Sequence, residues 1–288
     1  MTPALLVSLL ACPPVPTIGD SGSAVSDSGT RDSVDTGDPP TDSGRTDSTA
    51  DPTETGDTAP PIDSALFGVD TDGDGLSDGL ELQLGWDPED PDSDDDGFTD
   101  GEEYAGGTDG LLPWSWPLDG CRWPDLRDQA QALAAKGEQG WDDRDVVPDL
   151  VLTDQCGGQV SPWNFPGHVI VVDMAATWCG PCRDAAPMLQ DRFSAFRARG
   201  FVILTMLQGA TPDEAQAWAA EFGSAHPVMA DQDSELIDQL QERSTTYPSY
   251  VLIDANLVVR SVKVGEADQS WFDLYVPGLQ DERDAGLE

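Results

Sequence analysis

Positive charge is scarce in this sequence of 288 residues: 14 lysines and arginines stand against 55 aspartates and glutamates, for a net charge of −41 at pH 7. Such a field repels nucleic acid and anionic lipid headgroups, so we expect neither as a partner, and it attracts cations. Apolar residues are also few, at 38%, where a globular domain usually has about 45–50%. Part of the chain therefore does not belong to a packed core.

The apolar run at the N-terminus, residues 4–11, is far too short to cross a bilayer, which takes about 20 residues, but it has the length of a signal-peptide core. It leads into Leu9-Leu10-Ala11-Cys12, which resembles the lipobox of bacterial lipoproteins, where the cysteine is acylated. No basic residue precedes the run, so an ordinary secretory signal or a misassigned start codon is the alternative. In each case we expect an exported protein of the bacterial cell envelope. A lipid anchor on Cys12 would leave it facing the periplasm or the cell surface.

Residues 13–65 have the composition of a linker: from Gly19 to Pro61 nearly all are Ser, Thr, Asp, Gly or Pro, and none is aromatic. Such a segment cannot bury enough apolar surface to offset the entropy lost on ordering. Residues 13–110 hold 27 acidic residues and two basic ones, so the linker also repels itself. We predict a disordered acidic tether.

An internal repeat with a period of 22 residues lies within residues 66–110. Each copy has carboxylates at positions 1, 3, 5, 9 and 12 of a calcium loop and a glycine, Gly75 or Gly97, at the sharp turn. Ca²⁺ takes about six to eight oxygen ligands, and this spacing wraps them around one point, with a backbone carbonyl at position 7. The predicted ligands are Asp70, Asp72, Asp74, Leu76, Asp78 and Glu81 in the first loop, and Asp92, Asp94, Asp96, Phe98, Asp100 and Glu103 in the second.

The repeat pair resembles thrombospondin type 3 repeats of secreted bacterial proteins. The resemblance implies structural calcium, which orders an otherwise self-repelling segment, and we expect a small calcium-ordered stalk and no organic cofactor. A helix–loop–helix sensor and an acidic spacer without metal are the alternatives. The sensor is disfavoured because no amphipathic helix of adequate length flanks either loop.

From residue 146 to about 280 the composition is globular, and apolar runs alternate with helical patterns. Strands are predicted at 169–174, 201–207, 249–253 and 257–262, the last two as a hairpin, and helices at 181–199, 212–222 and 234–241. This alternation predicts an α/β fold with a mixed sheet flanked by helices. Before it, residues 111–145 form a Trp-rich connecting segment with a helical stretch at 126–135, and residues 281–288 form an acidic tail.

A Trp-Cys-Gly-Pro-Cys motif, residues 178–182, directly follows a predicted strand and opens a helix. The helix N-terminus places free N–H groups and partial positive charge around Cys179, which stabilises its thiolate, the species that attacks disulfides. Cys182, one turn further on, can then close a disulfide and release the product. Zinc binding is the alternative, but neither His168 nor His226 has suitable spacing for a second ligand pair.

With this motif, residues 146–277 resemble the thioredoxin superfamily, specifically its membrane-tethered TlpA/ResA-like branch. Asp173, Pro187, Pro248 and the hairpin-like opening at 150–158 stand where that family has matching features. The resemblance implies a thioredoxin-like fold in which Asp173 is a buried acid that relays the proton of the resolving cysteine. It also implies that Pro248 is a cis-proline facing the disulfide. Burial raises the pKa of a carboxyl group, which suits proton transfer near neutral pH.

The same resemblance implies a thiol–disulfide oxidoreductase that acts on disulfide-containing exported proteins. Trp178, Tyr247 and Pro248 are the predicted substrate contacts; Tyr247 departs from the threonine usual in the family, so substrate preference is not carried over. The Gly-Pro dipeptide between the cysteines resembles that of reducing thioredoxins, with a potential of about −270 mV. A reductase supplied by an unidentified membrane electron donor is therefore favoured.

Two cysteines, Cys121 and Cys156, are left over. In an exported protein such a pair is expected to form a structural disulfide, here worth about 3–4 kcal/mol in the chain-entropy model. A redox relay through Cys156 is the alternative.

Two other functions stay open. One is a peroxiredoxin-type peroxidase, although the residues before Cys179 do not fit its Pro-x-x-x-Thr-x-x-Cys pattern, which needs a proline. The other is a calcium-dependent surface module with a non-catalytic redoxin domain, against which the presence of Asp173, Pro187 and Pro248 beside both cysteines argues.

Overall fold

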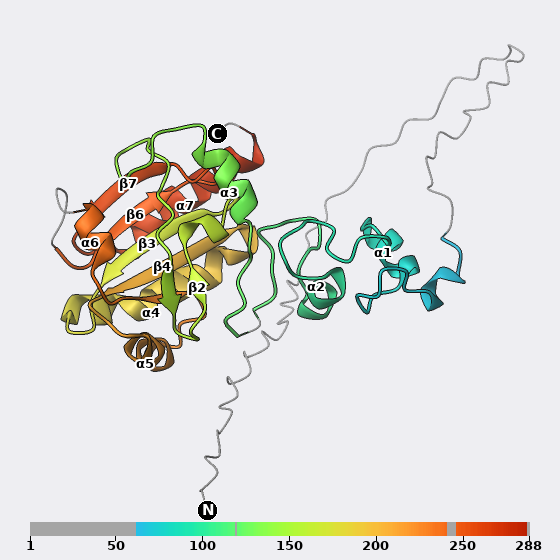
Figure 1. Cartoon of the computed structure of the whole chain (residues 1–288), viewed down its shortest axis with the longest axis horizontal. Coiled ribbons are helices and arrows are strands. Elements are labelled where there is room, and N and C mark those ends of the chain that lie inside the picture. Colours follow the sequence, from blue (N-terminus) through green and yellow to red (C-terminus); the bar gives the residue numbers. More distant parts are fainter. Residues whose placement is uncertain (1–61, 119, 241–245, 287–288) are drawn as a thin grey trace, which may run out of the picture. The chain divides into compact units, whose positions relative to one another are not determined.

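The computed structural model describes residues 62–118, 120–240 and 246–286 (Figure 1). The predicted signal, the predicted acylation site Cys12 and the predicted acidic linker as far as residue 61 lie outside the described residues. Within the described ranges, no helix is both long enough and apolar enough to cross a membrane.

The C-terminal region is built on one seven-stranded sheet with the order β2-β1-β5-β4-β3-β6-β7. The strands are β1 Leu152–Asp154, β2 Gln159–Val160, β3 Val169–Ala175, β4 Phe201–Gln208, β5 Val228–Asp231, β6 Ser249–Ile253 and β7 Val259–Val264. Strands β3, β4 and β5 run parallel, and β1 and β6 join them antiparallel on the two sides. The predicted mixed sheet and its β6–β7 hairpin are confirmed.

The helices of this region are α3 Arg127–Ala134, α4 Gly180–Phe196, α5 Pro212–Phe222, α6 Glu235–Leu240 and α7 Gln269–Asp284. Helix α4 contacts both α5 and α7, and Pro187 lies inside it. Helix α5 begins with a reciprocal cap, in which the Thr211 side chain accepts from the Glu214 N–H and the Glu214 side chain accepts from the Thr211 N–H. These caps explain why the sequence locates this helix well.

The sequence pattern does not predict β5 or α7. Phe272, Val276 and Leu279 of α7 are spaced to form one helical face and are buried in the core, but Pro277 interrupts the helical signal. The predicted acidic tail from residue 281 is therefore wrong at its start, because α7 runs on to Asp284. There, Arg283 donates a hydrogen bond to the Gly167 carbonyl at 2.9 Å.

Residues 111–145 are more than a connection. Trp116, Ala130, Ala134 and Trp141 are buried in the main core cluster together with the central strands. The Trp116 ring packs against His168, with ring centroids 4.8 Å apart. Apolar burial of this extent makes the segment part of the folded domain.

A short 3₁₀ helix, Leu66–Gly68, precedes the two repeats, which contain the helices α1 Asp78–Leu84 and α2 Asp100–Gly106, each seven residues long. Gly85 and Gly107 end these helices in the left-handed conformation, at φ 87° and 71°. Phe98 of the second loop is 1% exposed and belongs to the same buried cluster as Trp116. The short helices agree with the prediction that no long amphipathic helix flanks either loop.

Candidate active site and candidate metal loops

The cysteine pair lies where β3 passes into α4. Cys179 is the N-cap residue of α4, and its Sγ accepts a hydrogen bond from the Cys182 backbone N–H at 3.2 Å. The two residues form a disulfide and are 4% and 2% exposed. A sulfur held at a helix N-terminus is stabilised as a thiolate once the disulfide is reduced, because the N–H groups and the helix dipole favour negative charge there.

Aromatic side chains border this disulfide. Trp178 is 71% exposed, and its ring meets the Tyr247 ring edge to face, with centroids 5.8 Å apart. Tyr247 packs against the buried cluster that contains both cysteines, and the Tyr247-Pro248 peptide bond is cis. Burial, together with the nearby charge of Asp231, raises the pKa of the Tyr247 phenol to about 12, so this side chain stays neutral.

Asp173 lies within β3 and is 2% exposed. Its Oδ2 accepts a hydrogen bond from the Thr205 hydroxyl at 3.0 Å, whereas its Oδ1 has no partner among the described residues. Burial raises the pKa of this carboxyl group to about 7, and the Thr205 hydrogen bond opposes the rise. A carboxyl group with this pKa can take up and release a proton near neutral pH.

Sequence reasoning missed two residues of this network. Thr205 lies between Asp173 and His226, whose Nε2 is 3.2 Å from Thr205 Oγ1. Thr205 interrupts an otherwise apolar run from Phe201 to Leu207, and this signal could have identified it. The sequence pattern indicates no role for His226, since its spacing does not suit a zinc site.

The two repeats bring carboxylates together as the predicted loops require. Asp70, Asp72 and Asp74 form one group, and Asp92, Asp94 and Asp96 form another, with ligand atoms within 4.8 Å of one another in each. The side chains of Glu81 and Glu103, at position 12, are fully buried, and their carboxylate oxygens have no hydrogen-bond partner among the described residues.

Buried carboxylates without partners are costly unless a cation lies among them. Burial accordingly raises the pKa of Glu81 to about 7 and that of Glu103 to about 9. Leu76 and Phe98, the predicted carbonyl ligands at position 7, are buried beside these groups, and their N–H groups donate to the position 5 aspartates. This donor set, composed of oxygen ligands, fits Ca²⁺.

The aspartates at position 9, Asp78 and Asp100, are not members of these two groups, and their side chains close the loops. Both oxygens of Asp78 accept hydrogen bonds from Thr71, at 2.8 and 2.7 Å, and both oxygens of Asp100 accept from Ser93, at 2.9 and 2.6 Å. Each aspartate thus links the start of its loop to the helix that follows. The two repeats also meet, because Asp74 accepts a hydrogen bond from the Gly101 N–H.

Cys121 and Cys156 form a disulfide that ties the 111–145 segment to the turn between β1 and β2. Trp123 beside it donates from Nε1 to Asp154 at 2.7 Å. The neighbouring Arg122 stacks over the Phe98 ring at 4.2 Å, so the same segment also holds the second repeat.

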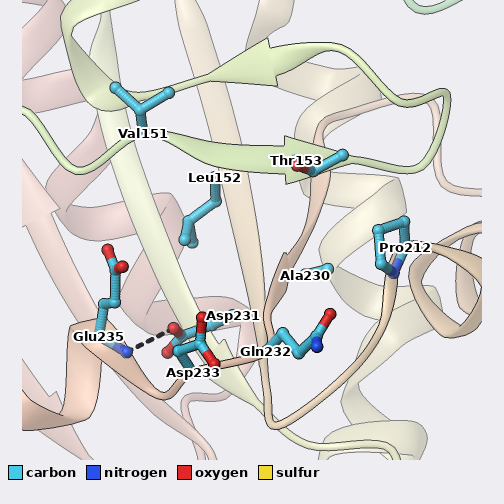
Figure 2. A pocket seen from close by; sticks show the side chains of 9 residues that line it. All are labelled: Val151, Leu152, Thr153, Pro212, Ala230, Asp231, Gln232, Asp233 and Glu235. Atoms are coloured by element: carbon cyan, nitrogen blue, oxygen red, sulfur yellow. Dashed lines mark hydrogen bonds between the residues drawn. The ribbon is translucent and has the colours of Figure 1, made fainter.

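The part of the chain that the structure describes also has a cavity of about 200 Å³. Figure 2 shows it between β1, the start of α5 and the end of β5, and it contains none of the predicted site residues. Asp231 at its wall accepts hydrogen bonds from the Glu235 and Leu236 N–H groups, at 2.6 and 3.3 Å. This carboxylate therefore helps to start α6.

Comparison with known proteins finds relatives of both regions. Residues 144–262 match the AhpC/TSA family, and residues 70–91 and 92–113 each match the bacterial TSP3 repeat. The C-terminal region is therefore an AhpC/TSA redoxin domain with a thioredoxin-like fold, and two TSP3 repeats precede it.

Individual proteins similar to this chain indicate the class of enzyme more closely than the family match does. The chain is 25% identical over 120 residues to the thiol-disulfide oxidoreductase ResA of Geobacillus thermodenitrificans, covering 42% of this chain and 68% of that protein. It is 22% identical over 140 residues to ResA of Bacillus subtilis, covering 49% and 77%. A crystal structure of a thioredoxin-family thiol:disulfide interchange protein from Chlorobium tepidum is 24% identical, covers 48% of this chain and 98% of that one, and has a TM-score of 0.44. The redoxin domain is thus a thiol–disulfide oxidoreductase of the ResA type.

Proposed function

We propose that this protein is an exported thiol–disulfide reductase that uses Cys179 and Cys182 to reduce disulfides of other exported proteins. The observation that carries the proposal is the placement of Cys179 as the N-cap of α4, with the Cys182 N–H directed at its sulfur. This placement favours a thiolate at Cys179, and the thiolate is the attacking species in disulfide exchange.

In the proposed reaction the Cys179 thiolate attacks one sulfur of a substrate disulfide. A mixed disulfide forms, and the other substrate sulfur leaves as a thiolate that takes up a proton. Cys182 then gives its proton to Asp173 and attacks the Cys179 sulfur, which closes the protein disulfide and releases the second substrate thiolate. That thiolate takes up the proton that Asp173 gives back. The substrate gains two electrons and two protons, and the dithiol of the protein is oxidised.

The aromatic side chains beside the disulfide, Trp178 and Tyr247, offer a surface on which a substrate can bind. Trp178 offers an exposed ring beside a disulfide that is itself almost fully buried. We expect Trp178, Tyr247 and the Pro248 turn to contact the polypeptide on either side of the substrate disulfide. A neutral aromatic surface suits partners of varied sequence, because the burial of apolar area does not depend on particular hydrogen bonds.

Each catalytic cycle leaves an oxidised Cys179–Cys182 pair that a further electron donor must reduce. For an exported reductase this donor is a membrane component, and an acylated Cys12 would keep the protein beside it. The TSP3 repeats would bind structural Ca²⁺ through the carboxylates grouped in the two loops, and calcium would supply the charge that lets these carboxylates stay ionised together.

The reduction potential of the Cys179–Cys182 pair tests the proposal. The full chain would be equilibrated with glutathione couples and its thiols trapped, with Cys179→Ser as the control. A potential near or below about −250 mV supports a reductase, and one above about −180 mV reverses the proposed direction of electron flow. The absence of a two-electron transition, or rapid turnover of hydrogen peroxide, would refute the proposed reaction.

A further inference from the structure

Three polar side chains form a hydrogen-bonded row in the interior of the redoxin domain. Thr205 Oγ1 lies 3.0 Å from Asp173 Oδ2 and 3.2 Å from His226 Nε2. The parallel register brings them together, because Asp173 of β3 pairs with Thr205 of β4, which in turn pairs with Val228 of β5, two residues after His226. All three side chains are at most 2% exposed.

The direction of these hydrogen bonds follows from the available protons. An ionised carboxylate only accepts, and a threonine hydroxyl has one proton to donate. When Asp173 is ionised, Thr205 therefore donates to Oδ2, and its own oxygen accepts from His226. This requires a neutral His226 with its proton on Nε2, and burial keeps the ring neutral by lowering its pKa to about 3.

We propose that Thr205 and His226 are positioning residues of the disulfide exchange: donating in series, they hold Oδ2 of Asp173 and leave Oδ1 to take the proton of Cys182. The inference rests on the proposed function and deepens it. Oδ1 is buried and has no hydrogen-bond partner among the described residues, so its lone pairs are available to the proton.

After burial, the hydrogen bond from Thr205 is the second influence on the pKa of Asp173. From β6, the facing residue is Tyr250, whose phenol stays protonated because burial, and then the charge of Asp173, raise its pKa. From α7, Phe272 packs against Tyr250, and from α4, Phe193 packs against His226 with ring centroids 5.6 Å apart. Within the described residues, burial and the Thr205 hydrogen bond account for the shifted pKa of Asp173.

The test is an infrared titration of the Asp173 carboxyl group in the oxidised full-length protein, with Asp173→Asn to identify the band. We expect Thr205→Val to raise the titration midpoint by about one to two pH units, because the carboxylate loses its hydrogen-bond donor. Thr205→Ser, which keeps the hydroxyl, should leave the midpoint unchanged.

His226→Phe keeps an aromatic ring beside Phe193 but removes the donor, so the midpoint should rise by less than in Thr205→Val. His226→Gln, which supplies an amide N–H, should restore it. In the Thr205→Val background, His226→Phe should add no further shift, because His226 acts through the Thr205 hydroxyl. The pH profile of mixed-disulfide resolution should move with the midpoint in each variant.

An unmoved midpoint in Thr205→Val would overturn this inference, as would a full His226→Phe shift in the Thr205→Val background. If Thr205→Val does not fold, the comparison of His226→Phe with His226→Gln decides the question alone. Normal disulfide reduction without midpoint shifts refutes the positioning role only. Midpoint shifts in a protein that reduces no disulfide refute the proposed function and, with it, the role in exchange.

Discussion

Removal of the Cys121–Cys156 disulfide should lower the stability of the folded protein without affecting its chemistry. The bridge closes a loop with a sequence separation of 35 residues, which corresponds to about 4 kcal/mol in the chain-entropy model. The native contacts around it should remain in a double serine variant, since Trp123 still donates to Asp154 and Asp154 still accepts from the Cys156 backbone N–H. The loss therefore comes mainly from the greater freedom of the unfolded chain.

The assay is thermal unfolding of the full-length oxidised protein with Cys121→Ser and Cys156→Ser combined, with calcium held constant. At about 2–4 °C for each kcal/mol, we expect Tm to fall by about 8–16 °C. The matched control is Cys179→Ser with Cys182→Ser, whose bridge closes a loop with a separation of only three residues and should matter less. A fall in Tm of less than about 2 °C would refute the argument, and loss of disulfide reduction in a folded double variant would favour the redox relay through Cys156 instead.

Three further predictions address the site and the repeats. Cys182→Ser should accumulate a mixed disulfide at Cys179 that survives non-reducing electrophoresis, because the resolving thiol is missing; rapid release of substrate would contradict the assigned roles. Burial raises the pKa of Asp173 from 3.8 in the unfolded chain to about 7 in the folded protein. The contribution of its protonation to the free energy of unfolding is therefore fully present below about pH 4 and is lost as the pH rises through about 7. The free energy of unfolding of Asp173→Asn, measured with urea, should therefore rise by about 4 kcal/mol relative to that of the wild type between pH 4 and pH 8. A difference between the two proteins that does not change with pH would exclude a buried ionisable group at this position. Chelation of calcium should lower Tm in the wild type and by a smaller amount in Glu103→Gln, since that variant lacks the buried carboxylate of the second proposed calcium loop while the first loop is unchanged; equal responses would argue against a site in the second loop.

Local patterns predicted the elements whose signals are contained within a few residues. The Thr211 cap and the apolar run of β3 act on their immediate neighbours, and so do the glycines at the turns of the two acidic loops. The sequence pattern does not predict helix α7, because Pro277 lowers its intrinsic helix propensity. Packing of its apolar face in the core compensates for this loss. The sequence pattern also does not predict that the 111–145 segment belongs to the core, since nothing in the local sequence distinguishes a buried tryptophan such as Trp116 from an exposed one.

The sequence alone predicts the class of chemistry, because the spacing of Cys179 and Cys182 and the spacing of the acidic loop residues are set by neighbours along the chain. It also indicated Asp173, through its position before the motif. Only the tertiary structure decided what holds Asp173. The register of three parallel strands brings Thr205 and His226 to it from positions 32 and 53 residues further along the chain, and such pairings leave no mark in the local pattern. A buried carboxyl group responds to whatever lies within a few ångströms of it, and those neighbours are chosen by the packing of the whole sheet.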